Sequence, residues 1–114
     1  MKNSLKAIIL GISIGLTSCS YWTGKIGNEK VFQYRGPFEN SLKITKPDGK
    51  EIKYIVTYSK NKVESVEITQ NKYSVTYTNN EIGKEALQVA QRQYEDYLTK
   101  ILVERKRKAL EDIQ

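Results

Sequence analysis

The sequence contains no histidine, a single cysteine and only two prolines. Without histidine, the chain lacks the commonest general base and the usual nitrogen ligand of zinc. One cysteine excludes a disulfide within the chain and any zinc site built from several thiolates. No glycine-rich phosphate loop occurs, and Glu64 and Glu67 fall on opposite faces of one predicted strand. We therefore expect no catalytic site, no metal site and no cofactor.

Long hydrophobic runs are also absent. The longest apolar stretch covers residues 7–16 and is interrupted by two glycines and a serine. As a helix, ten residues span about 15 Å, whereas the hydrocarbon core of a bilayer is about 30 Å thick. Lys2 and Lys6 give this segment a positive start without acidic residues. A charged start followed by a short apolar run is typical of an export signal.

The residues that follow are Leu16, Thr17, Ser18 and Cys19. This run resembles the lipobox of bacterial lipoproteins. The resemblance implies cleavage between Ser18 and Cys19, a diacylglyceryl group on the sulfur of Cys19, and acylation of the new N-terminus. It covers about the first 20 residues and identifies a processing class, and no specific family is recognised for residues 20–114.

The resemblance therefore predicts a signal peptide at residues 1–18 and an extracytoplasmic protein anchored by Cys19 to a bacterial membrane. Ser20 after the cysteine is compatible with the outer membrane if the host has one, and otherwise the anchor lies on the outer face of the cell membrane. Loss of Lys2 and Lys6 with the signal lowers the net charge from +6 to +4. This excess favours anionic lipid or an acidic partner, and export argues against nucleic acid as a partner.

The fold class predicted for residues 30–114 is α+β in a single small domain. Residues 24–29 are polar and carry glycines, so we expect residues 19–29 to form a lipidated, flexible tether. Residues 30–78 alternate between apolar and polar side chains, which predicts an antiparallel β-meander of about four to five strands with one apolar face.

Turn residues set the register of this meander. A three-residue turn at Pro47-Asp48-Gly49 places Leu42 opposite Tyr54 and Ile44 opposite Ile52. A two-residue turn at Asn71-Lys72 places Ile68 opposite Val75 and Val66 opposite Tyr77. For the turn within residues 59–62, a three-residue loop places Val56 opposite Val66 and Tyr54 opposite Ile68. The resulting apolar face includes Tyr54, Tyr58, Tyr73 and Tyr77, and the opposite face is polar except for Ile55 and Val63.

A long amphipathic helix is predicted over residues 84–112, with Asn80 or Gly83 as its N-terminal cap. The residues expected to face the sheet recur every three or four positions and are Leu87, Ala90, Tyr94, Tyr97, Leu98 and Ile101. Its 29 residues measure about 43 Å, against about 23 Å for a seven-residue strand. The helix therefore overhangs the sheet, breaks near residues 105–108, or meets another molecule. Leu102, Leu110 and Ile113, together with Val103, are the candidate partner contacts.

The only dense charge run is Arg105-Lys106-Arg107-Lys108. A solvated helix end is the favoured interpretation, with pairs between Glu104 and Lys108 and between Lys108 and Asp112. As the alternative, these four residues are candidate contacts to anions such as phosphates on lipid or glycan.

These features predict a non-enzymatic structural or assembly lipoprotein that docks to an envelope protein, or to itself, through its long helix. The alternative is a binding, immunity or exclusion module that captures a ligand or an incoming protein. Exposure of Leu102, Leu110 and Ile113 favours assembly, whereas their burial beside a tyrosine-lined pocket favours ligand binding.

Overall fold

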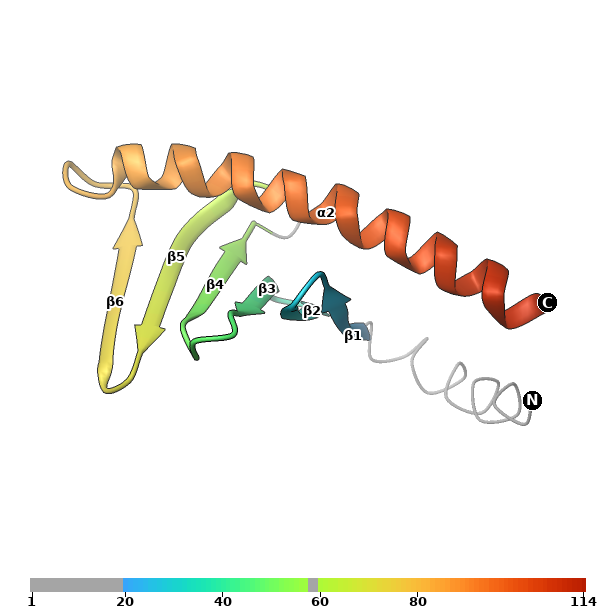
Figure 1. Ribbon diagram of the computed structural model, residues 1–114. Helices are drawn as coiled ribbons and strands as arrows, with labels where there is room; N and C mark the ends of the chain where they lie inside the picture. The colour runs from blue at the N-terminus through green and yellow to red at the C-terminus, as the bar shows by residue number, and fades with distance from the viewer. Residues whose placement is uncertain (1–19, 58–59) are drawn as a thin grey trace.

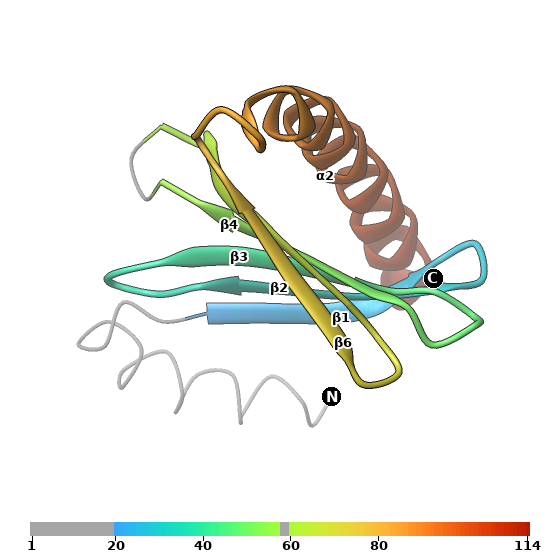
Figure 2. The same cartoon turned by 90° about the vertical axis from the view of Figure 1, so that its left-hand side faces the viewer.

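The computed structural model describes residues 20–57 and 60–114, which form one sheet and one helix (Figure 1). The elements are β1 (Ser20–Ile26), β2 (Glu29–Arg35), β3 (Asn40–Thr45), β4 (Glu51–Val56), β5 (Val63–Gln70), β6 (Tyr73–Thr78) and α2 (Lys84–Ile113). The six strands are antiparallel and lie side by side in sequence order. Helix α2 crosses one face of this twisted sheet (Figure 2). The predicted α+β meander with a long C-terminal helix is confirmed.

The sheet has six strands, so the predicted number of four to five is wrong. The additional strand is β1, which lies where a flexible tether was expected and pairs with β2 along its whole length. Two local features explain this pairing. Gly27 has a φ of +64°, which allows a two-residue turn between Ile26 and Glu29. The indole of Trp22 packs against the core and covers Gly24, where a Cβ atom would lie 2.5 Å from the ring.

The turns at residues 47–49 and 71–72 form as predicted. Gly49 and Asn71 adopt positive φ angles of 94° and 57°. Leu42 lies opposite Tyr54, and Ile68 lies opposite Val75. These registers follow from short-range turn geometry, which fixes which residues face each other.

The predicted register between β4 and β5 is wrong by two residues. Tyr54 lies opposite Val66 rather than Ile68. A bulge explains the difference, because Ile55 pairs with Ser65 while Val56 pairs with Val63, which leaves Glu64 as an extra residue. The bulge also turns Val63 into the core, where only 4% of its surface is exposed, although alternation placed it on the polar face.

The core lies between the sheet and α2, and its largest fully buried side chains are Leu42, Ile44 and Tyr54. Tyr73 was predicted to join this core, but 83% of its surface is exposed. The reason is that α2 starts beyond the opposite end of β6 and crosses the strands, so it leaves the end beside the 71–72 turn uncovered (Figure 1). Tyr58 lies outside the described residues.

Helix α2 runs without interruption through residues 105–108, so of the three alternatives left open by the sequence, a break at these residues does not occur. Before the helix, the side-chain oxygen of Asn80 accepts a hydrogen bond from the N–H of Gly83, the N-cap residue. The predicted sheet-facing stripe is confirmed, with Leu87, Ala90, Tyr94 and Ile101 buried and Tyr97 and Leu98 packed against the core. Six strands about 4.8 Å apart are about 24 Å wide, whereas a 30-residue helix is about 45 Å long. The C-terminal part of α2 therefore overhangs the sheet beyond β1 (Figure 1).

Candidate docking site on the C-terminal helix

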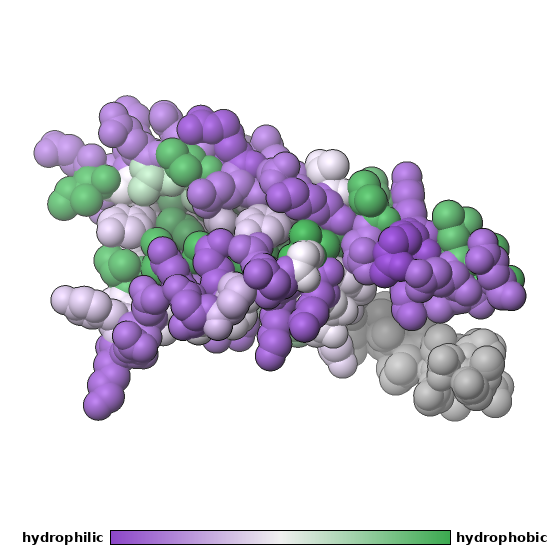
Figure 3. Space-filling view, in the orientation of Figure 1, coloured by the Kyte–Doolittle hydropathy of each residue, from purple (hydrophilic) through white to green (hydrophobic). Residues whose placement is uncertain are grey.

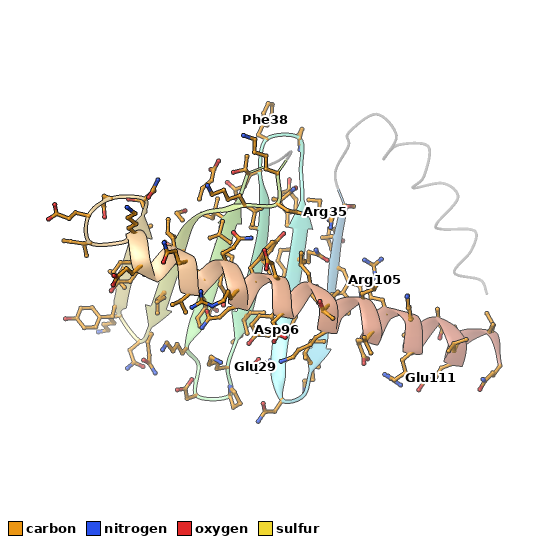
Figure 4. All side chains as sticks on the ribbon, turned by 90° about the horizontal axis from the view of Figure 1, so that it is seen from above. Glu29, Arg35, Phe38, Asp96, Arg105 and Glu111 are labelled. Atoms are coloured by element: carbon orange, nitrogen blue, oxygen red, sulfur yellow. The ribbon has the colours of Figure 1, made fainter. Side chains whose placement is uncertain are left out.

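Tyrosine hydroxyls fix the direction in which α2 crosses the sheet. Tyr97 donates a 2.6 Å hydrogen bond to Glu29 on β2, and Lys46 forms a 2.7 Å ion pair with the same carboxylate. Tyr54 on β4 donates to the side-chain oxygen of Gln93 at 3.0 Å. The helix is thus joined by hydrogen bonds to β2 and β4, and Lys46 directly after β3 supports the contact through Glu29. Figure 4 shows Glu29 beside α2.

The protonation of these groups follows from their surroundings. The hydrogen bond from Lys46, followed by that from Tyr97, lowers the pKa of Glu29 below its usual 4.5. Burial, assisted by the charge of Glu29, raises the pKa of Tyr54 to about 12. Burial and the hydrogen bond to Glu29 also raise the pKa of Tyr97. At neutral pH the carboxylate is therefore charged and both hydroxyls remain protonated donors.

The other side of the helix is held by the segment between β4 and β5. The side-chain oxygen of Gln91 accepts a 2.7 Å hydrogen bond from the backbone N–H of Val63. Tyr94 donates to the side chain of Asn61 at 3.2 Å. Because α2 is held from both sides, its overhanging end extends from a fixed base.

The helix leaves the sheet after Ile101, the last buried residue, which is 3% exposed. At four, seven and eleven residues further, the positions on the same side of the helix are Arg105, Lys108 and Asp112. Charged side chains at these positions remain in water, so the sequence itself ends the sheet-facing stripe.

The overhang carries a separate set of apolar side chains. Leu102, Val103, Leu110 and Ile113 are 54%, 63%, 58% and 80% exposed. Leu102 and Ile113 are about three helical turns apart, and Val103 and Leu110 are about two turns apart, so each pair follows one line along the helix. Figure 3 shows hydrophobic side chains on the projecting end of the molecule, separated by hydrophilic ones from the hydrophobic side chains over the sheet. We call these four residues the overhang stripe.

The four basic residues at 105–108 differ in whether they form ion pairs. Arg107 forms hydrogen bonds with Glu104, at 2.6 and 3.1 Å, and with Glu111. The hydrogen bond to Glu104 is the main reason that the pKa of Arg107 is raised, and it lowers the pKa of Glu104. The predicted pair between Lys108 and Asp112 forms, with 3.7 Å between Nζ and Oδ1. The predicted pair between Glu104 and Lys108 does not form, because Glu104 pairs with Arg107.

Two of the candidate anion contacts remain available. Arg105 and Lys106 make no ion pair or side-chain hydrogen bond with another residue in the described part of the chain. In Figure 4, Arg105 and Glu111 point to different sides of the overhang. The four cations therefore divide into a paired set and a free set, which their positions in the sequence do not distinguish.

A groove of about 1150 Å³ lies between the N-terminal half of α2 and the segment that joins β4 to β5. Most of the described residues that line it carry polar or charged side chains, such as Lys62, Glu64, Gln91 and Arg92, and Tyr94 is the one tyrosine among these described residues. The tyrosine-lined pocket that would favour ligand binding is thus not formed by these residues, and Leu102, Leu110 and Ile113 are exposed rather than folded back.

The sequence prediction named the residues of the overhang stripe but missed the contacts that orient it. Glu29 was assigned to the tether, and nothing local links it to Lys46 or to Tyr97, 68 residues away. The predicted cleavage and lipidation residues, Ser18 and Cys19, lie outside the described residues.

Within residues 20–57 and 60–114, no helical segment combines the length and the hydropathy that a bilayer-spanning helix requires. The same residues contain no group of three or more histidine, cysteine, aspartate or glutamate side chains that could hold a metal ion. Comparison with known proteins found no matching family model, no matching curated protein and no matching solved structure.

Proposed function

We propose that this chain is an exported, lipid-anchored envelope protein with a non-enzymatic assembly role, which docks to a protein partner through the overhang stripe. The observation that carries this proposal is the continuation of α2 beyond Ile101 with Leu102, Leu110 and Ile113 exposed. Apolar residues on an ordered helix that no other described residue covers are typical of an interaction surface.

The spacing of the stripe favours a partner with an apolar groove. Leu102 and Val103 lie at one end of the stripe and Leu110 and Ile113 at the other, and at about 100° per residue all four fall within about 100° of the helix circumference. A groove in a partner can enclose this side of the helix over about three turns. A second copy of the overhang is a poorer partner. Two helices of this length in flat contact bury less than the roughly 800 Å² per partner of a stable interface, whereas a groove surrounds more of the helix.

The anchor rests on the sequence signal at Leu16 to Cys19. Cys19 directly precedes Ser20, the first residue of β1. An acylated Cys19 therefore holds the sheet close to the membrane surface, without the flexible tether that the sequence suggested. The overhang extends beyond β1 on the face of the sheet that carries α2 (Figure 1), where a neighbouring envelope protein can reach it.

Site-specific photo-crosslinking in intact cells tests the docking proposal. A photoreactive side chain at Leu110 or Ile113 is expected to give one adduct of the same mass, larger than the chain and different from its dimer. The matched control is Lys108, which lies on the same helix but on the side of Ile101, and no such adduct is expected there. Equal adducts at all three positions, adducts with the mass of a dimer, or no adducts would each contradict the proposal.

A further inference from the structure

The outer face of β1–β3, which points away from α2, has an unusual composition. Its positions alternate with the buried residues Val31, Leu42 and Ile44. The nine outer residues are Tyr21, Thr23, Lys25, Lys30, Phe32, Tyr34, Ser41, Lys43 and Thr45. They include three lysines and three aromatic residues but no acidic residue. The adjacent outer positions of β4 and β5 carry Lys53 with Glu51 and Glu67, so the excess of positive charge is confined to the strands nearest Cys19.

Two lysines of this face are direct neighbours on adjacent strands, and none of its three lysines has an acidic partner among the described residues. Lys25 on β1 lies directly opposite Lys30 on β2, and like charges at such positions destabilise a sheet. Within residues 20–57 and 60–114, none of Lys25, Lys30 and Lys43 forms an ion pair. No described carboxylate therefore pairs with the lysines of this face.

Aromatic rings lie among these lysines. Tyr21 is 73% exposed, and its ring centre lies 5.9 Å from that of Phe32. A shallow hollow of about 560 Å³ is lined by Lys25, Lys30 and Lys43 around Phe32, with Thr23 and Thr45 at its sides. Cationic amines next to amphipathic rings suit the headgroup layer of a bilayer, where phosphates and the hydrocarbon boundary meet.

We infer that the outer face of β1–β3 lies against the anionic phospholipid headgroups of the membrane that holds the anchor. This inference rests on the proposed lipidation of Cys19, because the residue after Cys19 begins β1 at the edge of this face. The lysines meet lipid phosphates, and Tyr21 enters the interfacial layer. Helix α2 then lies on the far side of the sheet from the bilayer, which leaves Leu110 and Ile113 accessible to a protein partner.

Chemical labelling of lysines on the processed, lipidated protein tests this orientation. The protein is reconstituted into vesicles of phosphatidylcholine, with or without phosphatidylglycerol, and treated with a membrane-impermeant amine reagent. Mass spectrometry then measures the labelling of each lysine. In anionic vesicles at low salt, Lys25, Lys30 and Lys43 are expected to react several-fold more slowly than Lys72 and Lys106. This protection is expected to disappear at high salt, since salt screens exposed charges.

Two double variants with the same loss of charge provide the matched comparison. Lys25→Gln with Lys43→Gln is expected to remove the protection of Lys30. Lys60→Gln with Lys62→Gln, in the segment between β4 and β5, is expected to leave it unchanged. Equal protection of Lys30 in both variants, equal labelling of all lysines, or the same protection in vesicles without phosphatidylglycerol would overturn the inference. The anchor is scored separately, because release of the protein from vesicles at high salt would contradict lipidation of Cys19 itself.

Discussion

The hydroxyl of Tyr97 on α2 donates a 2.6 Å hydrogen bond to the carboxylate of Glu29 on β2, across 68 residues of sequence. Lys46 completes the arrangement by pairing with the same carboxylate. The contact lies only four residues before Ile101, where the helix leaves the sheet. It therefore fixes the direction of the overhang that we propose as the docking site.

Replacement of Tyr97 by phenylalanine removes the hydroxyl but keeps the ring in place. A hydrogen bond to a charged group contributes about 1.5–3 kcal/mol, and Glu29 retains Lys46, so we expect Tyr97→Phe to lower the free energy of unfolding by about 1–2 kcal/mol. Urea denaturation measures this change. Tyr21→Phe, on the exposed outer face, is the control and should have almost no effect. Equal stability of Tyr97→Phe and the parent would show that the contact does not hold the helix.

The lowered pKa of Glu29 predicts a loss of stability in acid. The folded state favours the charged carboxylate, so its contribution is complete above the unfolded pKa of 4.5 and disappears as the pH falls through the lower folded pKa. We expect a smaller decrease in the free energy of unfolding between about pH 5 and pH 3 in Glu29→Gln than in the parent, because an amide does not titrate. Lys46→Met should also reduce this decrease, since Lys46 is the main cause of the shift. Parallel pH profiles of the parent and Glu29→Gln would contradict this account.

Two adjacent residues test where the sheet-facing stripe ends. Ile101 is 3% exposed, so Ile101→Ala is expected to cost about 2–5 kcal/mol by leaving a cavity. Leu102 is 54% exposed, so Leu102→Ala should change stability by less than about 0.5 kcal/mol. Thermal and urea unfolding of both variants measure the difference. If Leu102→Ala were as destabilising as Ile101→Ala, the overhang would contact the rest of the fold and would not be free for a partner.

Cys19→Ala tests the anchor. The variant lacks the sulfur that the lipid requires, so we expect it to leave detergent-extracted membranes or to accumulate as the unprocessed precursor. Mass spectrometry of the parent should show a lipid adduct on Cys19 and no residues 1–18. Unchanged mass and unchanged membrane association in the variant would show that the chain is held in another way.

Short-range patterns in the sequence predicted much of the fold. Alternation along β3 and β4 and 3.6-residue periodicity along α2 identified residues that face the core, such as Leu42, Tyr54 and Ile101. Gly49 and Asn71, both with positive φ, fixed two of the hairpin registers. Each of these features depends on neighbouring residues and turn geometry alone, so a single sequence is enough to predict it.

Other features depended on contacts between distant residues. Strand β1 is polar and contains Gly24, and it forms because β2 pairs with it and because Trp22 packs against the core. The bulge at Glu64 places both Val63 and Val66 inside, which strict alternation does not predict.

The candidate docking site likewise has features that the sequence predicted and features that depend on the tertiary structure. The sequence by itself determined that Leu102, Val103, Leu110 and Ile113 lie on a helix and that charged residues end the sheet-facing stripe after Ile101. Only the tertiary structure decided that the helix crosses the strands instead of running along them, which leaves its last three turns uncovered. Only the assembled sheet brought Lys25, Lys30 and Lys43 onto one face. The physical reason is that periodicity records which side of an element is apolar, whereas the direction in which two elements pack depends on the shapes and hydrogen bonds of residues far apart in the chain.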